Sequence, residues 1–218
     1  MRYGIKLIGP AVWGGLGPEL AVSGPNVGCN VLDAVHVSGT IATAVYAARE
    51  EHIPAISFSG ATFGNLPWNV SPVPRHSTVY GKLGAILVNK LVEGGAPYLP
   101  RYTWLNVNFP EVTSDKCRKV KEFKWVLSRT DPVAHDHSKA DVLHCGRKRL
   151  PMEQTVITHD GCHIAVTVVD ARTKKTASVK KQALVLSRLH DMFTCLQWPE
   201  GSQKDEEGQE GCWTAKRT

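Results

Sequence analysis

A chain of 218 residues with 42% hydrophobic and 21% charged residues has the composition of an ordinary globular protein, which argues against global disorder. Its 26 Lys and Arg residues exceed its 20 Asp and Glu residues, so the formal net charge of +6 favours anionic partners such as phosphates. No apolar run approaches the roughly 18 residues of a membrane-spanning helix, and we expect no membrane partner.

The basic residues are spread along the chain. The densest runs are 116–124, 147–149 and 172–181, and none interleaves aromatic residues as an RNA-binding surface does. We interpret these runs as a solvated basic face and do not expect a nucleic-acid partner.

The six cysteines are widely spaced and form no Cys-x-x-Cys pair. They are Cys29, Cys117, Cys145, Cys162, Cys195 and Cys212. In a chain of this size, that spacing favours reduced, mostly buried thiols over a disulfide framework. The apolar residues near the start are interrupted by glycines and a proline, unlike a secretory signal. Together these features predict a cytoplasmic location.

Strands and helices alternate over the first half of the chain. Apolar residues at every second position predict a short strand over residues 3–8, and a buried strand follows at 20–23, ended by Gly-Pro. Ser38 is a natural N-cap for a helix over residues 41–51. Further strands are expected at 54–58 and 104–109, with a helix at 83–91 between them. This alternation is typical of a parallel sheet covered by helices, the α/β class.

The pattern changes after about residue 111. Two strands are expected at 123–127 and 163–169, followed by a closing helix within 184–196. We therefore expect three parts: a core over residues 1–112, a β-rich C-terminal extension with the closing helix over 113–198, and a disordered tail over 199–218.

The most informative segment runs from Ser23 to Asn30 and is followed by Ser38-Gly-Thr40. In a parallel sheet, ligands bind beyond the carboxyl ends of the strands, where residues 23–30 would lie. Asn26 and Asn30 offer amide oxygens, which are acceptable ligands for hard cations such as Mg²⁺. The helix start at Ser38 offers free N–H groups to an anion. From these residues alone, a turn and a helix cap are the favoured interpretation, and a phosphate-ester site is the alternative.

Several motifs over residues 19–110 resemble, in order and spacing, those of the survival protein E (SurE) family, and the Gly-Pro-Asn version is similar to its fungal acid-phosphatase-like branch. The motifs are Ser23-Gly-Pro-Asn26 with Gly28 and Asn30, Ser38-Gly-Thr40, Ile53-Pro-Ala-Ile56 with Ser57 or Ser59, and Leu105-Asn-Val-Asn-Phe-Pro110.

The resemblance implies a Rossmann-like, doubly wound domain that hydrolyses phosphomonoesters, such as nucleoside monophosphates, with a divalent metal (Mg or Mn), in homodimers or tetramers. By position, Asn26 is then a metal ligand. Ser38 and Thr40 are then catalytic, and both bind the phosphate together with Gly39 and Asn30.

One departure from the family pattern concerns the metal. Family members begin with a strand that ends in Asn-Asp-Asp-Gly, whose aspartates ligate the cation, and this sequence contains no Asp-Asp. One neutral Asn oxygen is too little for a cation that takes about six oxygen ligands. Our hypothesis is a truncated gene product or a misplaced start codon, which the upstream coding sequence would test. The alternative is a catalytically inactive remnant that binds phosphate or dimerises.

The same departure affects the sheet. Without a preceding strand, the strand at 20–23 has an unpaired edge, which the strand expected at residues 3–8 is a candidate to cover.

Other groups have simpler interpretations. A zinc site among the histidines and cysteines of the second half fits no standard spacing, so surface histidines are favoured. The residues concerned are His135, His137, His144, Cys145, Cys162 and His163. Asp131 and Asp136 show no sign of converging as an acid–base pair, and Asp33 is interpreted as a solvated loop residue.

Overall fold

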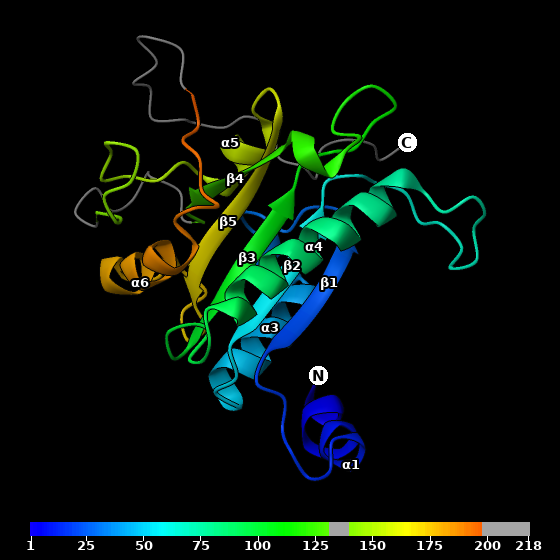
Figure 1. Cartoon of the computed structure of the whole chain (residues 1–218), viewed down its shortest axis with the longest axis vertical. Helices are drawn as coiled ribbons and strands as arrows, with labels where there is room; N and C mark the ends of the chain where they lie inside the picture. Colours follow the sequence, from blue (N-terminus) through cyan, green and yellow to red (C-terminus); the bar gives the residue numbers. More distant parts are fainter. Residues whose placement is uncertain (131–139, 198–218) are drawn as a thin grey trace.

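A five-stranded sheet forms the centre of the computed structural model, which describes residues 1–130 and 140–197 (Figure 1). The strand order is β1-β2-β3-β5-β4. The bounds are β1 (Ala21–Val27), β2 (Ala55–Gly60), β3 (Thr103–Phe109), β4 (Phe123–Ser128) and β5 (Cys162–Asp170). Neighbouring strands are parallel except β3 and β5, which are antiparallel. All five strands coincide with expected ones, and β1 extends further than predicted.

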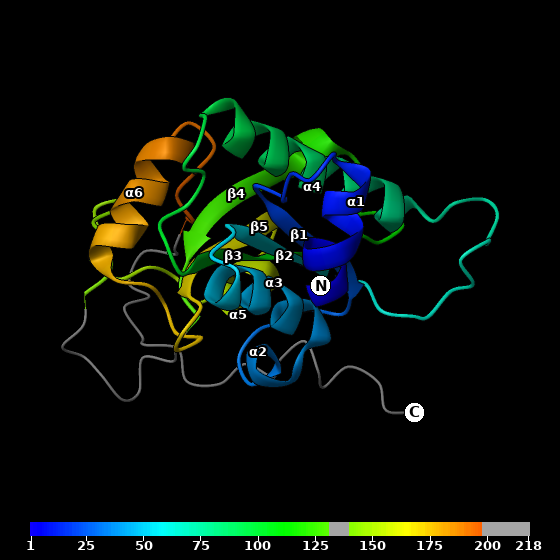
Figure 2. The same cartoon turned by 90° about the horizontal axis from the view of Figure 1, so that it is seen from below.

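Helices cover both faces of the sheet. Figure 2 shows α4 (Arg75–Glu93) and α6 (Val179–Leu189) on one face, and α3 (Gly39–Glu50) and α5 (Glu153–Thr158) on the other. The shorter elements are η1 (Gly4–Ile8), α1 (Gly9–Val12), α2 (Ala34–Val37) and η2 (Val120–Glu122). The arrangement confirms the predicted α/β class with a Rossmann-like, doubly wound and mainly parallel sheet.

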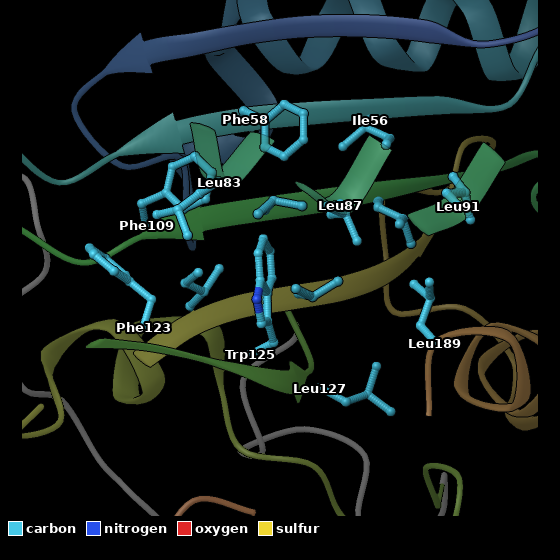
Figure 3. Close-up of a cluster of buried hydrophobic side chains, with 14 of the residues drawn as sticks. Ile56, Phe58, Leu83, Leu87, Leu91, Phe109, Phe123, Trp125, Leu127 and Leu189 are labelled. Carbon is cyan, nitrogen blue, oxygen red and sulfur yellow. The ribbon is translucent and has the colours of Figure 1, made fainter. Parts of the chain in front are cut away.

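The two faces of the sheet are filled differently because side chains alternate along each strand. On the α4 face, Ile56 and Phe58 of β2 pack in one cluster with Leu83 and Leu87 of α4 (Figure 3). On the α3 face, small residues such as Ala44 of α3 join a second cluster with Trp104. β2 and β3 are buried at every position, as expected for central strands of a doubly wound sheet.

The strand expected over residues 3–8 is wrong, because this segment is helical and forms η1 followed by α1. Ile5 is its buried side chain and packs in the α3-side cluster, while Lys6 forms an ion pair with Glu51 at 3.0 Å. A helical turn allows both side-chain contacts and also pairs its own backbone N–H and C=O groups. An alternation of apolar residues over only six positions was therefore too short to predict a strand. β1 is therefore an edge strand.

The two later helices differ from prediction in their bounds. α4 begins at Arg75, directly after Pro74, and is longer than the helix expected at 83–91. α6 ends at Leu189, before much of the predicted segment 184–196. β4 and β5 join the same sheet as β1–β3. The division at residue 112 stays a prediction, and the predicted tail over 199–218 lies outside the described residues, as do His135, His137, Asp131 and Asp136.

The expectation of reduced cysteines is wrong. Cys117 is bonded to Cys162, and Cys145 to Cys195. No cysteine in the described part of the chain is free. Sequence spacing did not reveal these pairs, because each joins residues 45 or 50 positions apart that the fold brings together. Disulfides are typical of oxidising compartments, so the cysteine argument for a cytoplasmic location no longer holds.

Candidate functional site

The junction between β1 and α3 carries the residues singled out in the sequence. Ser23 Oγ of β1 and Thr43 Oγ1 of α3 share a hydrogen bond of 2.6 Å, and Thr43 Oγ1 also donates to the carbonyl of Thr40 at 2.7 Å. β1 and β2 are parallel with α3 between them in sequence, so α3 runs back antiparallel to β1. From the Ser23–Thr43 contact, Asn26 and Thr40 therefore lie toward the same end of the sheet.

Ser38 begins α3 as predicted. Its Oγ accepts a hydrogen bond from the N–H of Ile41 at 3.2 Å, and its own backbone is extended, which is the geometry of an N-cap. The N–H groups of the first helical turn have no intrahelical partner, and Ser38 satisfies one of them. Gly39 is exposed, and an added Cβ there would meet nothing within 4 Å. The helix start is thus open to a ligand, and its partial positive charge favours an anion.

Asn26 is half-buried at the end of β1. Its Nδ2 donates to the carbonyls of Val27 at 3.0 Å and Gly28 at 2.9 Å, so Oδ1 is the polar atom left for a ligand. The strand reaches this position through an irregularity in its pairing with β2, between Ser23 and Asn26. Gly24 occupies that irregularity with φ +100°, and an added Cβ would lie 2.2 Å from the carbonyl oxygen of Phe58. A glycine is therefore required there.

Asn30 is buried, with 2% of its surface exposed. Its N–H donates to Asn108 Oδ1 at 2.8 Å and its Nδ2 donates to Ser59 Oγ at 2.7 Å. Its carbonyl accepts from Asn106 Nδ2 at 3.0 Å and Asn108 Nδ2 at 3.3 Å. Asn30 therefore fastens the loop after β1 to β2 and β3. Its role as a phosphate ligand stays a prediction.

This network extends to a carboxylate that the sequence did not indicate. Asn106 Nδ2 also donates to Glu153 Oε1 at 2.8 Å, and Glu153 is 1% exposed at the start of α5. The asparagines of Leu105-Asn-Val-Asn carried no assigned role, and their period of two places both on the α3 face of β3. That alternation could have indicated from the sequence that the two asparagines act together. No pattern in the sequence indicated Glu153, because only the fold brings it next to β3.

Tyr80 of α4 fixes the segment that leaves β2. Its hydroxyl donates to the carbonyl of Pro110 at 2.8 Å and shares a hydrogen bond of 2.8 Å with Thr62 Oγ1. Burial raises the pKa of Tyr80 to about 12, against the lowering effect of its bond with Thr62, so the hydroxyl stays protonated at neutral pH.

A divalent cation does not find a complete set of ligands among these residues. Residues 1–130 and 140–197 contain no group of three or more His, Cys, Asp or Glu side chains placed to hold a metal. Asn26 offers one neutral oxygen, and Asp33 is exposed at the start of α2. Cys145 and Cys162, two of the candidate zinc ligands, are in disulfides. The residues present do not fit the metal site that the resemblance implied.

In the described part of the chain, no helix is long and apolar enough to cross a membrane. The fold and the open helix start together define a doubly wound α/β protein with a strand–helix junction suited to an anion.

The family model described as survival protein SurE matches residues 4–131, which is more than half of the chain. The chain belongs to the SurE family.

The chain spans about half the length of the curated relatives it matches. An acid phosphatase from Yarrowia lipolytica is 26% identical over 212 residues, covering 86% of this chain and 59% of the relative. A 5'-nucleotidase SurE from Citrifermentans bemidjiense is 36% identical over 129 residues, covering 55% of this chain and 47% of the relative. The SurE protein structure from Aquifex aeolicus has a TM-score of 0.49 at 22% identity, covering 85% of this chain and 70% of that one.

Proposed function

We propose that this chain is a phosphomonoester hydrolase of the nucleotidase or acid-phosphatase kind, and that the start of α3 holds the phosphate. The observation that carries the proposal is the hydrogen-bonded chain Ser23–Thr43–Thr40, which fixes the first turn of α3 beside the end of β1. The names of the two relatives above, an acid phosphatase and a 5'-nucleotidase, support the reaction class.

The proposed contacts follow from the open helix start. The N–H groups of Gly39 and Thr40 donate to phosphate oxygens, and the Thr40 hydroxyl adds a donor. Ser38 holds these N–H groups in place because its Oγ is occupied by the cap. Such donors stabilise the negative charge of a phosphoryl group during its transfer to water. The substrates would be nucleoside monophosphates or other phosphomonoesters.

Metal dependence on Mg²⁺ or Mn²⁺, with Asn26 Oδ1 as one ligand, belongs to the same proposal, as does a homo-oligomeric state. No chemical step is derived through a cation, because the described residues do not complete a site for one.

A phosphatase assay on a generic phosphomonoester, with and without Mg²⁺ or Mn²⁺, tests the hydrolysis. We expect turnover that falls about tenfold or more in Thr40→Ala, since a lost oxyanion-type donor costs at least that much. Asn26→Ala should also lower turnover, because it removes the proposed oxygen ligand of the cation. Metal-independent turnover that survives both substitutions would rule the proposal out.

A variant of Thr43 tests the carrying observation. Thr43→Val keeps the side chain's shape but removes the bonds to Ser23 and Thr40, so phosphate affinity should drop with little change in stability, about 1 kcal/mol. Thr78→Val on α4 is the matched control, because Thr78 is exposed and far along the chain from the junction.

The absence of a metal-ligand cluster among the described residues favours a second candidate, an inactive module that binds phosphate or dimerises. It predicts phosphate binding without turnover. Titration of inorganic phosphate, followed by ³¹P NMR and paired with the activity assay, separates the two: binding with turnover supports the hydrolase, and binding without it supports the module.

A further inference from the structure

The loop over residues 61–74, between β2 and α4, projects away from the body of the molecule in both Figure 1 and Figure 2. Its apolar side chains are turned to solvent: Trp68 is 96% exposed, Val73 68%, Leu66 51% and Phe63 46%. A soluble monomer rarely gathers apolar side chains on one exposed segment without a use for them.

The base of this loop is held firmly. Thr62 shares a hydrogen bond with the Tyr80 hydroxyl, and its Oγ1 accepts from the N–H of Val112 at 3.0 Å. Pro72 and Pro74 restrict the other end, where α4 begins. The projecting apolar side chains therefore stand on a fixed base.

A basic groove continues from the end of the loop. It has a volume of about 1060 Å³ and lies between α4 and the segment 118–121. Its cationic side chains are all exposed: Arg75, Lys82, Arg118, Lys119 and Lys121. None of these five forms an ion pair with a carboxylate in residues 1–130 or 140–197. Glu122, next to the groove, directs Oε2 to the backbone N–H groups of Arg118 and Lys119.

The floor of the groove is aliphatic. Val79, Ala85 and Ile86 line it, and Ile86 is 41% exposed. A single-stranded nucleic acid would call for aromatic side chains in the groove on which bases stack. Aliphatic surface bordered by Lys and Arg, with a Trp on a neighbouring projection, is instead the combination that rests on the headgroup region of an anionic bilayer.

We propose that the loop 61–74 and the basic groove form a docking surface for an anionic phospholipid membrane. Trp68 and Leu66 enter the interface between headgroups and acyl chains, and the five cationic side chains contact the anionic headgroups. This attachment is peripheral and spans nothing. It departs from the expectation of no membrane partner, which rested on the lack of a spanning segment. It does not depend on the proposed hydrolase activity.

Vesicle co-sedimentation of the whole chain tests the proposal. Vesicles of phosphatidylcholine alone are compared with vesicles containing about one third phosphatidylserine, at low salt and at about 0.5 M salt. We expect binding to the anionic vesicles that is at least about tenfold stronger than to the neutral ones and that weakens with salt.

Two variants and two matched controls localise the binding. Lys121→Glu should lower the partition coefficient at least about tenfold, and Trp68→Ser several-fold. Lys180→Glu reverses an exposed charge on α6, and Trp13→Ser replaces a Trp that is 51% exposed near α1. Both controls should bind as the wild type does. Circular dichroism confirms that each variant is folded.

Three results would overturn the proposal. They are equal binding to neutral and anionic vesicles, equal loss in the control and test variants, and no binding to anionic vesicles. In the last case, salt-dependent binding to single-stranded RNA would identify a nucleic acid as the partner instead. Quenching of tryptophan fluorescence by brominated lipid gives an independent readout, which should be lost specifically in Trp68→Ser.

Discussion

The two edge strands of the sheet, β1 and β4, differ in how far they are exposed and in what links hold their surroundings. β1 pairs on one side with β2, and its side chains Val22 and Val27 are 44% and 50% exposed. β4 is also an edge strand, but Val126 and Leu127 are buried, and a disulfide from Cys162 anchors its partner β5. The candidate site residues lie near β1, which we call the open edge, while the disulfide and the buried ion pair lie near β4 and β5, which we call the closed edge. Strong links at a distance from a binding site allow the site itself to remain open and locally strained.

A buried ion pair distinguishes the closed side most clearly. Arg129 Nη1 and Asp141 Oδ2 are 3.1 Å apart, and their side chains are 7% and 4% exposed. Gln182 Nε2 donates to Asp141 Oδ1 at 2.9 Å, and the N–H of Leu150 donates to Oδ2 at 3.0 Å. Asp141 thus joins the end of β4 to α6 and to the segment before α5.

Removing this carboxylate should have the largest effect on stability. Asp141→Ala leaves Arg129 buried without its counter-charge, which costs about 3–5 kcal/mol of unfolding free energy. Urea unfolding followed by circular dichroism measures it. Below the unfolding transition, phosphate affinity at α3 should be unchanged, since the bonds of Asp141 reach Arg129, Leu150 and Gln182 and not α3. A variant that loses affinity while fully folded would break the division between the two edges.

At the open edge, Gly24→Ala should act on both stability and the site. The new Cβ would meet the Phe58 carbonyl at 2.2 Å, on a backbone with φ +100°. We expect a loss of about 3 kcal/mol and weaker phosphate binding, because β1 must shift away from β2. Gly17→Ala is the control, since a Cβ at Gly17 meets nothing within 4 Å. Undiminished phosphate binding in folded Gly24→Ala would show that the site does not depend on this strand geometry.

The fold was largely predictable because its signals are local. The segments of β2, β3 and β5 are rich in apolar residues, which predicts buried strands. Ser38 precedes a stretch with helical spacing of apolar residues, which predicts an N-cap. The strand predicted over residues 3–8 was wrong, because an alternation over six residues is also compatible with a helix. Here Ile5 packs in the same cluster as the buried side chains of α3. The disulfides failed because pairing depends on tertiary proximity, which spacing along the chain does not encode.

The site was predictable in its segments more than in its connections. Asn26 and Ser38–Thr40 stand out through strand-end and helix-start chemistry. The hydrogen bonds that surround them cannot be read from the sequence. Asn106 is bonded to Asn30, which is 76 positions away in the sequence, and to Glu153, which is 47 positions away. A buried polar network is a property of the folded sheet, so the sequence shows its members without their partners.

That network gives the next prediction. Asn108→Ala removes the acceptor of the Asn30 N–H, which leaves a buried donor unsatisfied and costs about 1–3 kcal/mol. Because Asn30 fastens the loop after β1, phosphate binding should weaken as well. Asn89→Ala on the exposed surface of α4 should leave both unchanged. Thermal unfolding and phosphate titration measure the two effects, and an Asn108→Ala protein with wild-type affinity would limit the network to a structural role.

The smallest effect we expect is confined to acid pH and concerns the closed side. Burial of the Asp170 carboxyl at the end of β5 would raise its pKa, but hydrogen bonds from Arg172 and Lys181 outweigh this and hold the pKa below its ordinary value. A lowered pKa means that the stabilisation is complete above about pH 4 and is lost as the pH falls below it. Asp170→Asn should therefore be less stable than the wild type at neutral pH, and the difference between their unfolding midpoints should narrow progressively as the pH falls below about 4. Asp160→Asn, at an exposed position, should follow the wild type throughout. A constant gap between Asp170→Asn and the wild type would mean that packing, rather than charge, links β5 to α6.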